Sequence, residues 1–66
     1  MQAKLLKMKM IKYGDDVASL AECLGITRQT LSSKINGNRE FKQSEIDMIA
    51  DRYDLTPHEV VAIFLT

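Results

Sequence analysis

The chain is divided at regular intervals by residues that typically end or begin helices. Gly14, Gly25, the Asn36-Gly37 pair and Pro57 separate stretches of about 8 to 13 residues, the usual length of a short helix. No stretch between them sustains the alternation of apolar and polar residues that a half-buried strand requires. The sequence therefore predicts an all-α protein whose helices are joined by tight connections.

Five helices are expected, and the 66 residues are enough for one small core, so residues 1–66 are predicted to form a single compact domain. Asp16 and Thr27 are suitable N-caps for the second and third helices. The stretch Thr56-Pro57-His58-Glu59 fits a capping box at the start of the fifth. The predicted ranges are about 3–13, 16–24, 28–35, 43–53 and 57–65.

Residues 20–31 have the pattern of a helix-turn-helix. Ala21 is small where two helices must approach closely, and Gly25, four residues later, can adopt the positive φ that the turn requires. Leu31 and Ile35, spaced i, i+4, are expected to anchor the second helix of the motif to the core. Each feature is common alone, but together and in register they indicate a helix-turn-helix.

The predicted helix 28–35 carries few apolar residues, so most of its surface must face water or a ligand. At its first turn, Arg28 can pair bidentately with guanine and Gln29 with adenine in the DNA major groove. Ser32 and Ser33, one turn further on, are short enough to let the helix approach the bases closely. These four side chains are therefore the candidates for base contacts, and a solvated helix face is the alternative.

Charge is segregated along the chain, although the net charge is zero. Residues 1–12 contain four lysines and no acid, and residues 27–42 contain four cations and one acid. Residues 43–66 contain five acids and one arginine. Such a chain can turn a positive face toward phosphates, although accidental clustering on a solvated surface would look the same. The side chains suited to phosphate contacts are Lys34, Asn38, Arg39 and Lys42.

The stretch "SLAECLGITRQTLSSKINGNREF" resembles the phage repressor and Cro type of helix-turn-helix domain (XRE-like, lambda-repressor-like), in particular the short forms found in mobile elements of Gram-positive bacteria. The resemblance covers about residues 5–65, with Ile35-Asn36-Gly37 and the capping box among its most specific pieces. It implies a lambda-repressor-like fold in which helix 28–35 enters the major groove and residues 36–42 touch phosphates. Thr27 and Asn36, at the two ends of that helix, complete the predicted phosphate contacts.

One position departs from the family pattern. Many members carry Gln at the first position of the second helix, where it helps to anchor the protein to DNA, but this chain has Val17, which donates no side-chain hydrogen bond. The backbone N–H groups of this helix start can still bind phosphate. Asp15 and Asp16 would repel phosphate if they pointed outward, so Asp16 is expected to act as a structural cap.

The resemblance implies a sequence-specific regulator of transcription that binds double-stranded DNA, of the Cro or small-repressor kind, in the cytoplasm of a bacterial host. One recognition helix reads few base pairs, so a homodimer on a palindromic site is expected. Val61 and Leu65, in the strongly apolar last segment, are the candidate dimer interface, unless they close the core instead. Two alternatives stay open: a protein-interaction module of antitoxin or adaptor type, favoured by zero net charge and Val17, and an accessory factor for excision or replication.

The remaining residues form no pattern typical of a catalytic or metal-binding site. One histidine and one cysteine, far apart, give no zinc-binding spacing, and no phosphate-binding Gly-rich loop or catalytic motif is present. No enzyme activity, metal, cofactor or small-molecule effector is therefore expected. Met1, Met8 and Met10 are expected to be the initiator and core filler, Cys23 a half-buried small residue and His58 a surface residue. No apolar run approaches the roughly 20 residues of a membrane span.

Overall fold

The computed structural model describes all 66 residues and contains five helices and no strand. The helices are α1 (Ala3–Lys12), α2 (Val17–Leu24), α3 (Arg28–Ile35), α4 (Gln43–Arg52) and α5 (Pro57–Phe64). The predicted all-α class is confirmed, and each observed helix end lies within one residue of its predicted position. None of the five helices has the length and apolar character that crossing a membrane requires.

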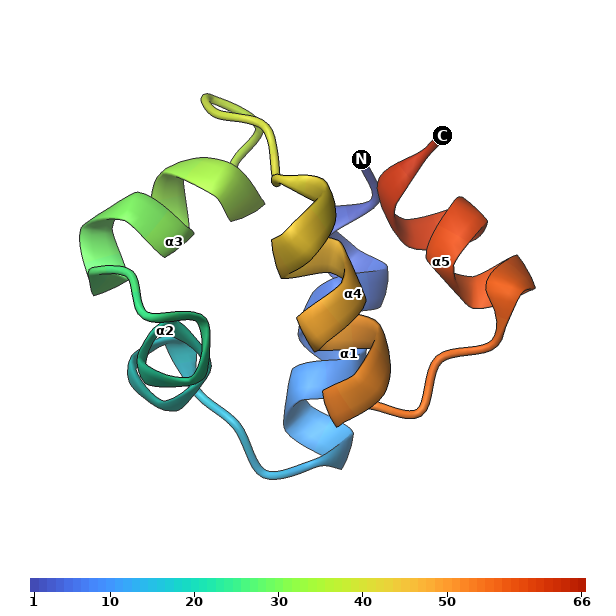
Figure 1. The fold of residues 1–66 in the computed structure, drawn as a ribbon, viewed down its shortest axis with the longest axis horizontal. Helices are drawn as coiled ribbons and strands as arrows, with labels where there is room; N and C mark the ends of the chain where they lie inside the picture. The colour runs from blue at the N-terminus through green and yellow to red at the C-terminus, as the bar shows by residue number, and fades with distance from the viewer.

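The helices surround one core to which each of them contributes. In Figure 1, α4 lies in front of α1 at the centre, α2 and α3 lie on one side, and α5 lies on the other. The chain ends are close together, and the backbone N–H of Gln2 donates to the carbonyl of Ile63 at 2.7 Å. The buried cluster consists of Leu6, Met10, Leu20, Ala21, Leu24, Leu31, Ile35, Ile49, Tyr53 and Ile63.

Side-chain caps start three of the helices where the sequence predicts them. The carboxylate of Asp16 accepts the Ser19 N–H at 2.8 Å, and the hydroxyl of Thr27 accepts the Thr30 N–H at 3.1 Å. At α5, Thr56 and Glu59 form the reciprocal capping box, with Pro57 at the first helical position. These caps satisfy backbone donors that a helix start leaves unpaired, and so fix where α2, α3 and α5 begin.

The structure changes one prediction about apolar residues and removes the alternative to another. Met10 is buried as expected, but Met8 is 57% exposed on the outer side of α1 and does not fill the core. Val61 and Leu65 are also exposed, at 47% and 68%, so they do not close the core of the chain. The inner residue of α5 is Ile63, which is 2% exposed.

Candidate nucleic-acid interface

The turn between α2 and α3 has the predicted geometry. Gly25 adopts a left-handed conformation (φ 71°, ψ 28°) that ends α2, and the N–H of Ile26 donates back to the carbonyl of Ala21 at 3.1 Å. A β-carbon placed on Gly25 would meet no atom within 4 Å, so its φ and not a lack of space favours glycine. Ala21 is 2% exposed, and α2 packs directly against α3. The helix-turn-helix is therefore present.

The first turn of α3 presents two polar side chains to solvent. Arg28 and Gln29 are exposed, and neither side chain has a hydrogen-bond or ion-pair partner within the chain. Leu31 and Ile35 of the same helix are buried in the core. Ser32 and Ser33 are half-buried, so they lie at the edge of the exposed side. We refer to Arg28, Gln29, Ser32 and Ser33 as the outer side of α3.

Lys34 does not lie on a solvated face, and the prediction that it contacts phosphate is wrong. Its side chain is 4% exposed, and its Nζ lies 2.5 Å from Oε1 of Glu45, which is 7% exposed. A buried ammonium already paired with a carboxylate cannot reach a ligand in solvent. The signal was present in the sequence, because Lys34 follows Leu31 by three residues and so falls on the buried side of the helix.

Glu45 is a structural residue that the sequence analysis missed. The same oxygen that binds Lys34 also accepts the backbone N–H of Lys42 at 2.8 Å, which satisfies a donor at the start of α4. Lys42 itself has no side-chain acceptor, so the cap at this helix comes from Glu45 alone. Burial raises the pKa of Glu45, but hydrogen bonds from Lys34 and the Lys42 N–H more than offset this, and the net shift is downward. One carboxylate thus joins the end of α3 to the start of α4.

Residues 36–42 link α3 to α4 and extend from the body of the molecule (Figure 1). The N–H groups of Asn38 and Arg39 both donate to the carbonyl of Ser33, at 2.9 and 3.3 Å, so the segment folds back onto the end of α3. Asn36, Asn38, Arg39 and Lys42 are all exposed, as is Thr27 at the other end of α3. The predicted phosphate-contacting side chains other than Lys34 therefore lie at the two ends of α3.

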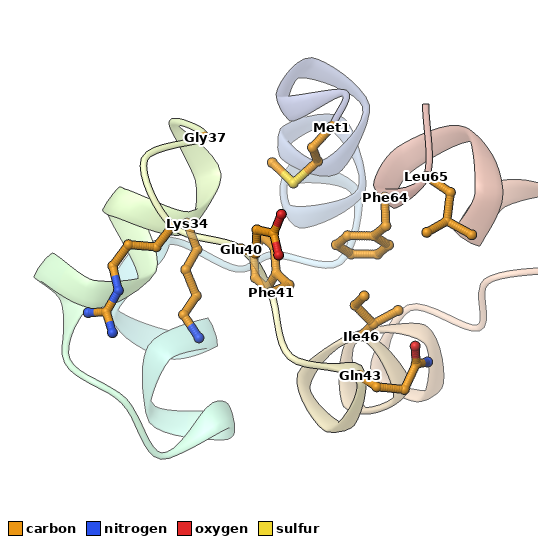
Figure 2. A pocket seen from close by; sticks show the side chains of 10 residues that line it. Met1, Lys34, Gly37, Glu40, Phe41, Gln43, Ile46, Phe64 and Leu65 are labelled. Carbon is orange, nitrogen blue, oxygen red and sulfur yellow. The ribbon is translucent and has the colours of Figure 1, made fainter.

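Behind this segment is the larger of the two cavities, with a volume of about 460 Å³. Figure 2 shows Phe41, Ile46, Phe64 and Leu65 around it, together with Met1 from the start of the chain. The rings of Phe41 and Phe64 pack edge to face, with centroids 5.3 Å apart. This contact ties the 36–42 segment to α5 and holds its inner side against the core.

The start of α2 is held by a cluster that removes a negative charge from the surface. Asp16 is the cap, as predicted, whereas Asp15 turns inward and receives two hydrogen bonds from Arg52, at 2.6 and 2.8 Å. The hydroxyls of Tyr53 and Ser19 also donate to Asp15, at 2.6 and 2.7 Å. The hydrogen bonds from Arg52 above all hold the pKa of Asp15 well below its usual range, against the opposing effect of burial.

This cluster changes the electrostatics expected at Val17. Asp15 stays ionised, but Arg52 balances its charge, so it adds no net repulsion beside the start of α2. Val17 is half-buried and packs against the core. Burial raises the pKa of the Tyr53 hydroxyl, and its hydrogen bond to Asp15 adds to this effect, so Tyr53 remains a neutral donor. No sequence motif predicted that Asp15 contacts Arg52 and Tyr53, which follow it by 37 and 38 positions.

The remaining candidates lie where the sequence predicts. Cys23 is half-buried, and His58 is exposed in the first turn of α5. Lys4 and Lys7 are exposed and unpaired on α1, whereas Lys9 forms an ion pair with Glu59 of α5. No three histidine, cysteine or acidic side chains come together as a group that could hold a metal ion.

The geometry described so far is that of a helix-turn-helix with a free polar side. Comparisons with curated proteins and with solved structures found no match for the chain. A family model described as the Cro/C1-type HTH DNA-binding domain matches residues 5–64, nearly the whole chain. This match confirms the predicted resemblance and supports binding of double-stranded DNA. The chain therefore belongs to the family of Cro/C1-type helix-turn-helix DNA-binding domains.

Proposed function

We propose that this protein is a sequence-specific regulator of transcription, of the Cro or small-repressor kind, that inserts α3 into the major groove of its operator. The observation that carries the proposal is the outer side of α3, where Arg28 and Gln29 are exposed and unpaired while the inner side of the same helix is buried. Side chains that have no partner in the free protein keep their hydrogen-bonding capacity for a ligand.

Arg28 and Gln29 are assigned to base contacts. Both lie in the first turn of α3, the part of a recognition helix that typically reaches the base edges. A bidentate pair between Arg28 and guanine, or between Gln29 and adenine, discriminates against the wrong base by about 1–3 kcal/mol. Ser32 and Ser33 lie one turn further along α3, and their short side chains can form hydrogen bonds with either base type.

Phosphate contacts are assigned to the two ends of α3. Thr27 lies at its start, and Asn36, Asn38, Arg39 and Lys42 follow its end. The N-terminal backbone of α2 is a weaker site for phosphate: Arg52 balances the charge of Asp15, but the exposed carboxylate of Asp16 has no cationic partner and already accepts the Ser19 N–H. These contacts set register and affinity without sequence preference, and they make binding weaken as salt increases.

The protein is proposed to bind as a homodimer to a palindromic site. One helix of eight residues reads only a few base pairs, and two copies related by a two-fold axis extend the site to two half-sites. Val61 and Leu65 are the candidate interface, because both are exposed apolar residues and no unpaired charged side chain lies on α5. Exposed apolar residues that lie together at a helix end are a common starting point for an interface between copies.

The test is selection of bound sites from random DNA, followed by two matched substitutions. The selected sites should contain an inverted repeat. Gln29→Ala should lower affinity for the selected site by about 1–3 kcal/mol and relax the preference at one base position. Lys42→Ala should weaken binding to selected and unrelated DNA alike. Losses from both substitutions that ignore sequence would contradict the base-reading assignment.

A protein-interaction module of antitoxin or adaptor type is the second candidate. It is supported by the zero net charge, by Val17 in place of the usual Gln, and by the exposed apolar residues of α5. A mobility-shift titration at two salt concentrations separates the candidates. A DNA-binding regulator should bind far less tightly at the higher salt. Undetectable or salt-independent binding would favour the interaction module instead.

A further inference from the structure

Two helices carry exposed faces that neither the core nor the proposed DNA contacts use. We call one the cationic face, formed on α1 by Lys4, Leu5, Lys7, Met8, Ile11 and Lys12. We call the other the acidic face, formed by Asp47, Met48 and Asp51 on α4 and by Asp54 just beyond its end. From these two faces we propose that copies of this chain associate head to tail, with the cationic face of one copy against the acidic face of the next.

The charges of the cationic face are free. None of its three lysines forms an ion pair, whereas Lys9, beside Leu5 and Met8 at the edge of this face, is paired with Glu59. Lys4, Lys7, Met8 and Ile11 follow the i, i+3, i+4, i+7 spacing, so they form one stripe along the helix. Like charges one turn apart destabilise a helix, and no acid of the same chain forms an ion pair with these lysines. An acidic partner would neutralise them.

The acidic face has the complementary properties. Asp51 and Asp54 have no side-chain partner, and Asp47 accepts only a hydrogen bond from the neutral Gln43, at 3.0 Å. Asp47 and Asp51 are one turn apart, again an arrangement of like charges that costs helix stability. Three unpaired lysines on one face thus correspond to three unpaired aspartates on the other, within a chain of zero net charge.

Each face also includes exposed apolar side chains beside its charges. Ile11 is 77% exposed and Met8 lies beside it on α1, while Met48 is 41% exposed between Asp47 and Asp51. Contact between the faces would bury these side chains and leave the ion pairs at the rim, the usual arrangement of a protein interface. The apolar side chains supply association energy, and the charges set the orientation of the two copies.

The positions of the helices make the contact head to tail. α1 and α4 both bury residues in the same core, and α4 lies in front of α1 in Figure 1. Their exposed faces therefore point away from each other, so one copy cannot use both faces on the same partner. A contact of this type does not close on itself and can continue from copy to copy. Neither face includes α3, residues 36–42, or Val61 and Leu65. Both faces therefore stay available when the chain binds DNA or forms the proposed dimer.

The experiment uses two charge-neutralised variants of the full chain. Lys4→Gln/Lys7→Gln removes two charges of the cationic face, and Asp47→Asn/Asp51→Asn removes two charges of the acidic face; all four positions are exposed, and circular dichroism verifies the fold. In sedimentation velocity, the wild-type protein should associate with increasing concentration, and the association should weaken by about tenfold or more when salt shortens the Debye length from about 10 Å to about 3 Å. Each variant alone should lose the association.

A mixture of the two variants is the decisive arm, because each retains the face that the other lacks. With the Lys4→Gln/Lys7→Gln variant labelled with ¹⁵N, addition of the other variant should shift amide signals of residues 43–54 and not those of residues 3–12. General attraction between oppositely charged chains would shift both regions and would overturn the proposal. So would a wild-type protein without salt-sensitive association, the result expected if these faces bind an unrelated acidic or basic partner.

A variant without change of net charge tests the apolar side chains. Ile11→Ser should weaken wild-type association by about tenfold, because it removes a large apolar side chain from the contact. Lys4→Arg/Lys7→Arg should retain the association, because it keeps both charges in place. Association that is unaffected by Ile11→Ser would mean that the two faces do not meet as described.

Discussion

Two lysine–glutamate pairs in this protein have the same design but different surroundings. Glu45 and Glu59 are each the third residue of their helix, and each accepts the backbone N–H of the residue that precedes the helix, at 2.8 and 3.0 Å. Each also binds a lysine from another helix at 2.5 Å, Lys34 from α3 and Lys9 from α1. The same contacts therefore join α4 to α3 and α5 to α1.

The difference is solvent exposure. The side chains of Lys34 and Glu45 are 4% and 7% exposed, whereas those of Lys9 and Glu59 are 23% and 34% exposed. Water screens the outer pair and can replace either partner, but it cannot reach the inner one. The comparison teaches that geometry alone does not rank ion pairs: the inner pair is the one whose disruption leaves an unpaired charge in the core, at the end of α3.

The largest effect is expected from removing one glutamate of each pair. Glu45→Ala leaves the Lys34 ammonium buried without a partner and should lower the free energy of unfolding by about 3–5 kcal/mol. The matched variant Glu59→Ala should cost clearly less, because Lys9 can turn into water. Urea denaturation of both variants measures the difference. Equal losses would show that the two pairs do not differ in the way their exposure indicates.

A smaller effect is expected when both charges of the inner pair are removed together. Lys34→Met/Glu45→Gln replaces the ammonium with an apolar side chain of similar length and keeps a side-chain oxygen for the Lys42 N–H. Because neither charge must then be desolvated, the double variant should lie within about 1 kcal/mol of the wild-type free energy of unfolding. A loss as large as that of Glu45→Ala would contradict this account of the pair.

The smallest effect is a pH dependence of the outer pair. The hydrogen bond from Lys9, helped by the Thr56 N–H, lowers the pKa of Glu59 from 4.5 to about 2. A lowered pKa in the folded state stabilises the protein above about pH 4.5, and this stabilisation is lost as the pH falls toward 2. The stability difference between wild type and Glu59→Gln should therefore shrink over that range. A difference that stays constant from pH 5 to about 2 would contradict the lowered pKa.

The sequence predicts the features of this protein that depend on neighbours along the chain. The capping box of Thr56 and Glu59 spans three residues, and the turn at Gly25 depends on its own φ, so both were recognisable from short patterns. The exposure of Gln29 follows from the spacing of Leu31 and Ile35, which assigns it to the opposite side of α3. Arg28 shares the side of Leu31 by spacing, and it is exposed because it is the first residue of the helix. The family match over residues 5–64 agrees with this assignment of the fold.

The contacts that sequence analysis missed join residues that are distant along the chain. Glu45 binds Lys34 across 11 positions, and Arg52 binds Asp15 across 37. Lysine is rarely buried, so the general preference for exposure outweighed the helical spacing that places Lys34 inside. The exposure of Met8 was also not predicted, because an apolar residue in a short helix can lie on either side until the packing of the other helices is known.

Glu45 also makes the length of the segment before it adjustable. Its carboxylate binds Lys34 ahead of residues 36–41 and the backbone of Lys42 after them, so the two ends of this segment are held together whatever lies between. Closing a longer loop costs only about 0.6 kcal/mol for each doubling of its length. Residues 36–40 can therefore be lengthened, or exchanged for a segment of different charge, while α3 keeps its position and Phe41 keeps its contact with Phe64. In engineering terms, the DNA contacts proposed here would let affinity be tuned at the loop separately from specificity at the helix.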